Sequence, residues 1–401
     1  MPDSPPLAPS SRLVSLDAYR GFVMLLMAAE ILQIPNVAKH FPDSLLWGWL
    51  AFNNEHVAWS GGLSEVCSLH DLIQPSFSFM VGVALPFSLA ARSARGQSWW
   101  WMLGHALWRS LLLILLGVLL RSAHAKQTYW TFEDTLSQIG MGYPFLFLLG
   151  FLNNRLRCFV LLLLLTAYWG FFAHYEVPAD WTPAMANVPA GWAYDFQGFA
   201  SHWNLNHNPA WAFDRWFLNL FPRAEPFIGH PSGYSTLNFI PTLGTMLLGL
   251  IAGKWLKERE APMQPALRLF VAGAVCFFLG VVLHTTGVCP IIKKIWTPSW
   301  TLYSGGWCCW LMAAFYLLID VTGWKAWAFP LVVIGMNSIA MYFMAHSTKD
   351  YVGKTLDIHF GTQWTTVAGP TFVPMLHGAA VLLGLWLILL WMYRRRLFLK
   401  I

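Results

Sequence analysis

The chain has 401 residues, of which 57% are hydrophobic and only 11% are charged, and its formal net charge is +6. Charged residues make up roughly a quarter of an ordinary soluble domain, so this composition excludes a soluble enzyme and indicates a multi-span membrane protein. The six cysteines include no CxxC pair, and this spacing gives no indication of a zinc site or a disulfide framework.

Apolar stretches long enough to cross a bilayer recur along the whole chain. A helix of about 18 to 25 apolar residues spans the hydrocarbon core. We therefore expect an all-α polytopic membrane bundle of about ten transmembrane helices, forming a single domain over residues 1–401. The predicted spans are residues 13–34, 71–91, 100–120, 136–153, 156–175, 235–256, 265–287, 301–321, 326–346 and 371–393. A long loop, residues 176–234, lies between the fifth and sixth spans.

Lysine and arginine residues concentrate in short segments on one side of this topology, among them Arg92, Arg155, Lys254 and Arg394. The positive-inside rule then predicts that both termini are cytoplasmic and that the long loops lie on the opposite side. The basic residues stand at the ends of apolar segments and form no stripe, so we expect a lipid bilayer around the protein and no nucleic-acid partner.

The loop over residues 176–234 is rich in tryptophan, asparagine and histidine, including Trp192, Trp203 and Asn204. Aromatic rings beside amides suit carbohydrate, because C–H faces stack on the rings while hydroxyls bond the amides. The other interpretation of these tryptophans is an aromatic belt at the membrane interface.

Ionisable residues inside predicted spans usually face a cavity or a partner. In the first span, Asp17 and Arg20 stand three residues apart on one helical face, so they either pair with each other or bind an anionic ligand from the cytoplasm. Glu30 lies near the other end of the same span, and we expect it to point into the outer mouth of the bundle.

A histidine and a carboxylate flank the entrance of the second span. His56 lies in the first outer loop, and Asp71 opens the span. When a carboxylate accepts a hydrogen bond from one ring nitrogen, the other nitrogen is free to accept a proton. The pair could therefore act as a general base. The spacing alone is weak evidence, because thirteen histidines offer many chance pairings.

Other polar residues interrupt the spans at their entrances. Gln138, Asn238 and Asn337 are amides within apolar surroundings, and Lys293 and Lys294 stand beside Trp296 in an outer segment. Such amides either join helices by hydrogen bonds or converge on one cavity.

At these residues the chain resembles the multi-span acetyltransferases typified by heparan-alpha-glucosaminide N-acetyltransferase, and their bacterial relatives in particular. Residues 15–21 (SLDAYRG) are similar to the family's SLDxxRG, residues 56–59 (HVAW) to its HxxW, and residues 71–77 (DLIQPSF) to its DLxxPxF. Residues 235–241, 290–306 and 335–338 also match. Each motif is modest, but the ordered set covers nearly the whole chain.

The resemblance implies that His56 is the catalytic residue and that an acetyl group moves from cytoplasmic acetyl-CoA to the amine of a terminal glucosamine across the membrane. It also implies a bacterial inner-membrane location and a possible homodimer. Two features depart from the family's pattern. A few extra residues, around 62 to 66, separate His56 from Asp71, and Glu30 lies next to the place where an asparagine is expected.

On this basis we expect an acetyltransferase with acetyl-CoA as co-substrate and no metal. His56 acts as general base or transient acetyl carrier, with Asp71 and Glu30 beside it. The residues expected to bind the glycan or small-molecule acceptor are Trp59, Asn204, Asn238, Lys293, Trp296 and Asn337. Those expected to bind acetyl-CoA are Arg20, Gln138 and Lys294.

Three alternatives remain open at this point. A transporter also has broken helices and polar groups within the membrane, although no repeat relates the two halves of this chain. A non-catalytic assembly component would not bind CoA. An enzyme of the same class with another acyl group, or with a hydroxyl acceptor on an envelope glycan, would share all of these motifs.

Overall fold

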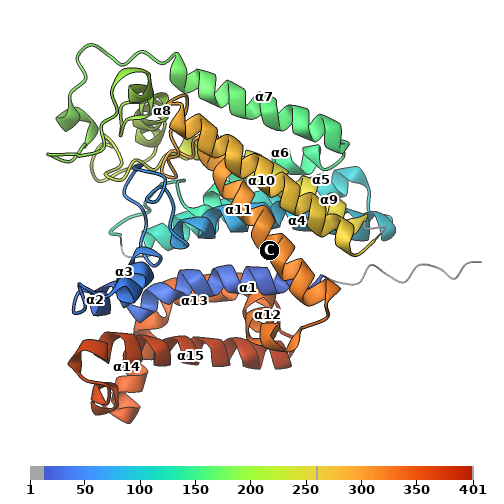
Figure 1. The fold of residues 1–401 in the computed structure, drawn as a ribbon, viewed down its shortest axis with the longest axis vertical. Helices are drawn as coiled ribbons and strands as arrows, with labels where there is room; N and C mark the ends of the chain where they lie inside the picture. Colours follow the sequence, from blue (N-terminus) through green and yellow to red (C-terminus); the bar gives the residue numbers. More distant parts are fainter. Residues whose placement is uncertain (1–12, 124, 259–260, 400–401) are drawn as a thin grey trace, which may run out of the picture.

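The computed structural model describes residues 13–123, 125–258 and 261–399, and within these ranges it contains helices and loops but no β-strand. The predicted all-α polytopic fold is confirmed. Figure 1 shows the long helices side by side, with their ends gathered at two opposite faces. Both termini, which the topology prediction places in the cytoplasm, lie outside the described residues.

Helices occupy each of the ten predicted spans. They are α1 (Val14–Ala28) with η1 (Ala29–Leu32), α4 (Ile73–Ala94), α5 (Trp99–Ser122), α6 (Thr135–Leu149), α7 (Asn154–Ala173), α9 (Phe239–Lys257), α10 (Met263–Thr285), α11 (Pro298–Tyr316) with the π-helical turn η7 (Leu317–Val321), α12 (Phe329–Met336) with α13 (Ser338–Ser347), and α15 (Val373–Arg394).

Not all of these segments have the length of a full span. In the described ranges, seven helices are long and apolar enough to cross a membrane, and an eighth span results if α12 and α13 count as one. Helix α6 has 15 residues and therefore extends ~22 Å, less than the ~30 Å hydrocarbon core. The count of about ten spans is thus higher than the seven to eight that these helices support.

The ninth predicted span is broken. Helices α12 and α13 meet at an angle of 70°, and Asn337 between them has a non-helical backbone. Its side chain donates to the carbonyl of Leu397 and accepts the backbone N–H of Leu399. The amide therefore bonds the chain beyond α15 at the point where the helix stops.

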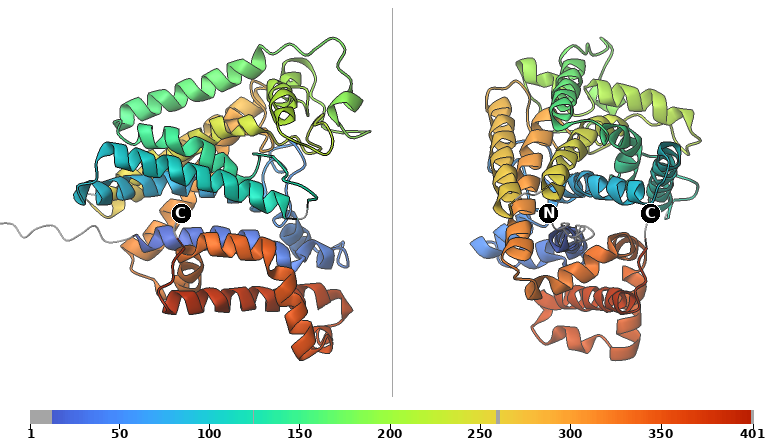
Figure 2. Two further views of the ribbon diagram at one scale, coloured as in Figure 1. Left: turned by 180° about the vertical axis from the view of Figure 1, so that it is seen from behind. Right: turned by 90° about the vertical axis from the view of Figure 1, so that its right-hand side faces the viewer.

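The helices form two layers, visible in Figures 1 and 2. The first layer contains α1, α12, α13, α15 and the short α14 (Lys349–Phe360), and the second contains α4 to α11. Helix α1 packs on α12 within its own layer and also contacts α4 and α11 of the other layer. We call the region between the layers the seam.

Close helix packing depends on a few glycines. A Cβ atom on Gly249 of α9 would lie 1.9 Å from the carbonyl oxygen of Phe79 in α4, and one on Gly335 of α12 would lie 1.8 Å from that of Asp17 in α1. Backbones approach this closely only where there is no side chain, as is common where helices associate in membranes.

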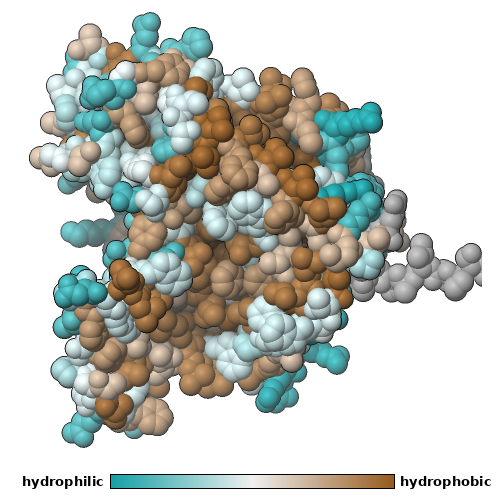
Figure 3. All heavy atoms as spheres, in the orientation of Figure 1, coloured by the Kyte–Doolittle hydropathy of each residue, from teal (hydrophilic) through white to brown (hydrophobic). Residues whose placement is uncertain are grey.

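The outer surface agrees with a bilayer environment. Figure 3 shows a broad hydrophobic band across the middle of the molecule, with hydrophilic residues at both ends. Large apolar side chains of the outer helices are more than half exposed there, among them Leu119 (60%), Leu162 (66%) and Phe278 (61%). Exposed apolar area of this extent favours contact with lipid.

One end of the bundle carries most of the loops, and we call it the loop face. Its short helices are α2 (Ile34–Ala38), α3 (Leu45–Phe52), η2 (His70–Leu72), η3 (Pro183–Ala186), η4 (Gly198–Trp203), α8 (Pro209–Phe217), η5 (Leu218–Leu220) and η6 (Thr236–Asn238). The loop over residues 176–234 packs through Trp203 and Leu205 against Trp59 and Phe172. At other points of the chain lie η8 (Ala326–Ala328), η9 (Gln363–Thr366) and η10 (Pro370–Phe372).

Candidate active site

His56, Asp71 and Lys293 meet at the loop face. The Nδ1 atom of His56 lies 2.9 Å from Oδ1 of Asp71, and the Lys293 ammonium lies 2.9 Å from both of these atoms. Residues 53–69 bring in the histidine, η2 the aspartate, and the loop before α11 the lysine. His56 and Asp71 are thus in direct contact, and the extra residues around 62 to 66 do not separate them.

Asp71 is the anchor of this site. Its side chain is fully buried, and its second oxygen, Oδ2, accepts from the backbone N–H groups of Val57 and Ser68 and from the Ser68 hydroxyl. A buried carboxylate needs this number of donors, because an unpaired one is very costly. Val57, next to His56, and Ser68, three residues before Asp71, are thereby bonded to the same carboxylate.

The protonation of His56 follows from its surroundings. Burial and the nearby Lys293 ammonium lower the pKa of His56 to about 4, so the ring is neutral at pH 7. Burial works against the charge of Lys293, but Tyr234 and Asp71 outweigh it and raise the pKa of the lysine. The tautomer with its proton on Nδ1 donates to Asp71 and leaves Nε2 free to accept a proton, whereas the other tautomer accepts from Lys293 through Nδ1.

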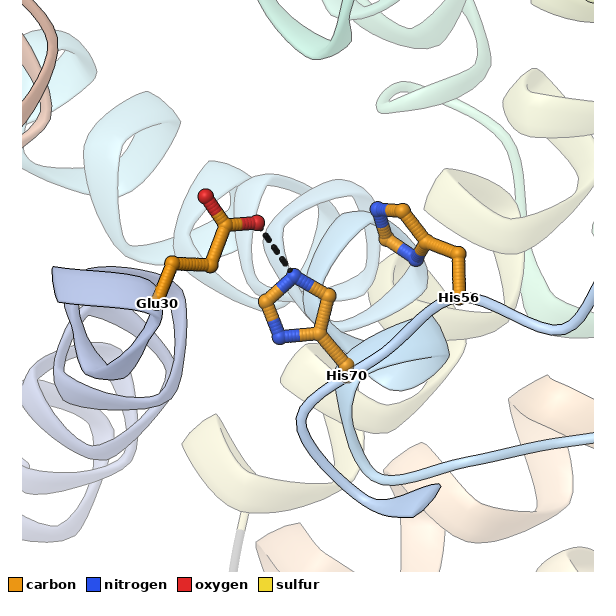
Figure 4. Close-up of side chains that lie close together, drawn as sticks. All are labelled: Glu30, His56 and His70. Atoms are coloured by element: carbon orange, nitrogen blue, oxygen red, sulfur yellow. Dashed lines mark hydrogen bonds and ion pairs between the residues drawn. The ribbon is translucent and has the colours of Figure 1, made fainter. Parts of the chain in front are cut away.

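A second histidine, His70, lies against the first. Its Nε2 atom is 2.7 Å from Oε1 of Glu30, and its ring centroid is 4.5 Å from that of His56. His70 is buried, whereas the side chains of His56 and Glu30 are 40% and 57% exposed. Figure 4 shows the Glu30 carboxylate and both rings converging on one place. Sequence reasoning did not single out His70, although it directly precedes Asp71.

These side chains open into a cavity of about 390 Å³ on the seam. The first layer contributes Glu30, Tyr342 and His346, and the second layer contributes Arg121 of α5. The other lining residues near His56 are His70, Lys293, Lys294, Glu133 and Tyr234. His56 also borders two neighbouring cavities of about 370 and 360 Å³, so its ring is accessible from more than one direction.

Lys294, Asn238 and Gln138 lie close to this cavity in different roles. The Lys294 ammonium lines the cavity and donates to the Tyr234 hydroxyl at 3.1 Å. Asn238 donates to the carbonyl of Lys294 at 2.7 Å, and it therefore holds the two-lysine segment in place. Gln138 donates to three backbone carbonyls, those of Phe132, Ser235 and Thr236.

Two predicted tryptophans are packed into the interior near the site. Trp59 is 1% exposed and lies beside Trp192. Trp296 is equally buried, adopts a left-handed backbone with φ of 47°, and donates to the Thr245 hydroxyl. Neither ring is among the side chains that line the cavity.

The remaining predicted residues lie elsewhere. Asn204 bonds both the backbone N–H and the carbonyl of Phe196 within the long loop. Arg20 lies 3.7 Å from Asp17 within α1, and Asn337 bonds the chain beyond α15. The structure therefore does not bring Asn204, Arg20 or Asn337 together with His56.

Comparison with known proteins identifies two related sequences. Human heparan-alpha-glucosaminide N-acetyltransferase is 23% identical to this chain, over an alignment covering 97% of this chain and 60% of the human protein. The mouse protein of the same name is 24% identical, with 98% and 61% coverage. The chain thus spans about three fifths of the length of these relatives. No family model matches it.

The alignments extend over nearly the whole chain, including the segments that carry His56, Asp71 and Lys293. The identity is low, but the alignments cover almost all of this chain. The chain is a distant relative of the heparan-alpha-glucosaminide N-acetyltransferases.

Proposed function

We propose that this protein is a membrane acetyltransferase that moves an acetyl group from acetyl-CoA to the amine of an amino sugar or related glycan at the loop face, on the periplasmic side of a bacterial inner membrane. The observation that carries the proposal is the imidazole of His56, which lies 2.9 Å from the buried Asp71 carboxylate and lines a cavity. The names of the two relatives support the same reaction class.

The reaction needs a base and a donor for developing negative charge. An amine attacks the thioester carbon in its neutral form, and Nε2 of His56 takes the amine proton as the carbon–nitrogen bond forms. The carbon–sulfur bond then breaks, and the CoA sulfur leaves with the proton that His56 returns. The Lys293 ammonium lines the same cavity and supplies a positive charge near the oxyanion.

A second route has the same overall balance. Nε2 of His56 attacks the thioester carbon, the carbon–sulfur bond breaks and CoA leaves as the thiolate. The amine then attacks the acetyl-imidazolium, which frees the imidazole, and the amine proton goes to the CoA thiolate. In either route Asp71 orients the ring, and Lys294 lies where it can contact a negatively charged group of acetyl-CoA. Arg20 lies in α1, ten residues before Glu30, and is not among the residues that line the cavity.

The direct test is His56→Ala, purified in detergent and assayed with labelled acetyl-CoA and glucosamine. We expect transfer to fall by at least about 10²-fold while the protein stays folded, because general base catalysis alone contributes about 10²–10⁴-fold. His174→Ala is the matched control. His174 caps its own helix α7 through Gly170, so full activity is expected. Retained transfer in His56→Ala would refute the assignment.

The broken helix pair α12 and α13 favours one alternative, a transporter of a small sugar or metabolite, because broken helices are common at transport sites. Accumulation of unmodified glucosamine in sealed proteoliposomes, without acetyl-CoA, would support it. Appearance of acetylated product only when acetyl-CoA is present would exclude it.

A further inference from the structure

We propose that Glu30, His56 and His70 form a binding site for a divalent transition metal, best suited to zinc, and that occupation of this site blocks His56. The metal site stands on geometry alone. The blocking step rests on the proposed function of His56, so the two parts are tested separately.

The three residues offer the ligand atoms that zinc prefers. They supply two imidazole nitrogens and one carboxylate oxygen, and all three atoms lie within 4.8 Å of one another. Zinc holds such atoms at about 2.0–2.2 Å in a tetrahedral array, which places them roughly 3.3 Å apart. Glu30 and His70 are already within 2.7 Å, so modest rotations of exposed side chains complete the geometry.

The surroundings of the three residues favour metal binding. The His56 nitrogen that does not face Asp71 points toward Glu30 and His70 (Figure 4). A metal-bound histidine usually has its other ring nitrogen on a carboxylate, which fixes its orientation, and Asp71 supplies this partner. Counting Glu30, Asp71 and Lys293, the cluster carries a charge of −1, which attracts a cation.

Access and coordination number also fit. Three protein ligands leave a fourth zinc position open, and here that position faces the cavity that Glu30, His56 and His70 share. His70 changes tautomer when its Nε2 atom binds the metal, so that its proton moves to Nδ1 and the ring stays neutral.

Metal binding and acetyl transfer use the same atom. A zinc ion on Nε2 of His56 occupies the lone pair that would accept the amine proton or attack the thioester. The bound ion therefore inhibits transfer, and removal of the ion restores it.

The test is zinc binding to the full-length protein in detergent. The protein is treated with a chelator, exchanged into metal-free buffer and titrated with ZnCl₂ in a calorimeter. We expect one ion per chain for the unmodified protein and at least tenfold weaker binding for His70→Ala and for Glu30→Gln. His346→Ala is the control, because His346 lines the same cavity outside the cluster, and its affinity should not change.

Absence of saturable one-to-one binding, or an affinity in Glu30→Gln and His70→Ala equal to that of the unmodified protein, would overturn the metal site. The blocking step is tested by assaying transfer at saturating zinc and after chelation, and unchanged transfer would overturn it. The parts separate cleanly. Zinc binding with no transfer activity even after chelation contradicts the proposed function and keeps the site, whereas zinc-insensitive transfer without zinc binding contradicts the site alone.

Discussion

The ion pair of Lys293 and Asp71 allows a quantitative prediction. The two atoms are 2.9 Å apart, and the side chains are 6% and 0% exposed. Lys293→Met leaves a buried carboxylate without its cation. Removal of one partner from such a pair typically costs about 3–5 kcal/mol. The double variant Lys293→Met/Asp71→Asn removes both charges, so we expect it to recover at least half of this loss.

The assay is reversible denaturant unfolding of each variant in one detergent, arranged as a double-mutant cycle. We expect a coupling free energy of about 2–4 kcal/mol between the two positions. Leu119→Ala, at a lipid-facing position of α5, is the control for a substitution outside the site and should not couple to Lys293→Met. Additive losses in the Lys293/Asp71 double variant, or a cost below about 1 kcal/mol for Lys293→Met alone, would refute the reasoning.

Two further predictions concern stability. Burial raises the pKa of Asp214 in α8 from its usual value near 4 to about 7. The ionised form is therefore disfavoured in the folded state. The free energy of unfolding should fall as the pH rises from about 4 to 7, by an amount on the order of 4 kcal/mol. Asp214→Asn should remove this dependence in thermal unfolding measured across that range, and a slope equal to that of the unmodified protein would contradict it. Gly249→Ala forces α9 away from α4 and should cost about 1–3 kcal/mol, whereas Gly170→Ala, with no neighbour within 4 Å, should be neutral or slightly stabilising; equal unfolding free energies for the two variants would contradict the packing argument.

The sequence was sufficient to locate the helices, because apolar runs of membrane length have few other uses. It did not reveal the break at Asn337, since an amide inside an apolar run is equally consistent with a straight helix joined to a neighbour by a hydrogen bond. The partners of this amide, Leu397 and Leu399, are more than fifty residues away in the chain.

The candidate site was predictable only in part. His56 and Asp71 belong to motifs on either side of one short loop, so their proximity follows from local order. Lys293 was named from its setting among tryptophans, and its contact with Asp71 depends on how α11 packs. His70 was missed because the motif over residues 71–77 begins one residue later, at Asp71. Only the folded structure shows that the Glu30 side chain contacts His70.

The seam has a consequence for controlling this protein from outside. Glu30 belongs to one layer, and His70 and Lys293 belong to the other. The distance between the Glu30 carboxylate and the His70 imidazole therefore depends on the separation of the two layers. A small hydrophobic compound wedged between α1 and α4 would pull the carboxylate off the imidazole without entering the cavity. Because Glu30 belongs to the proposed metal site, such a compound would weaken metal binding. It would resemble neither a sugar nor a coenzyme, and a screen for competitors of either would overlook it.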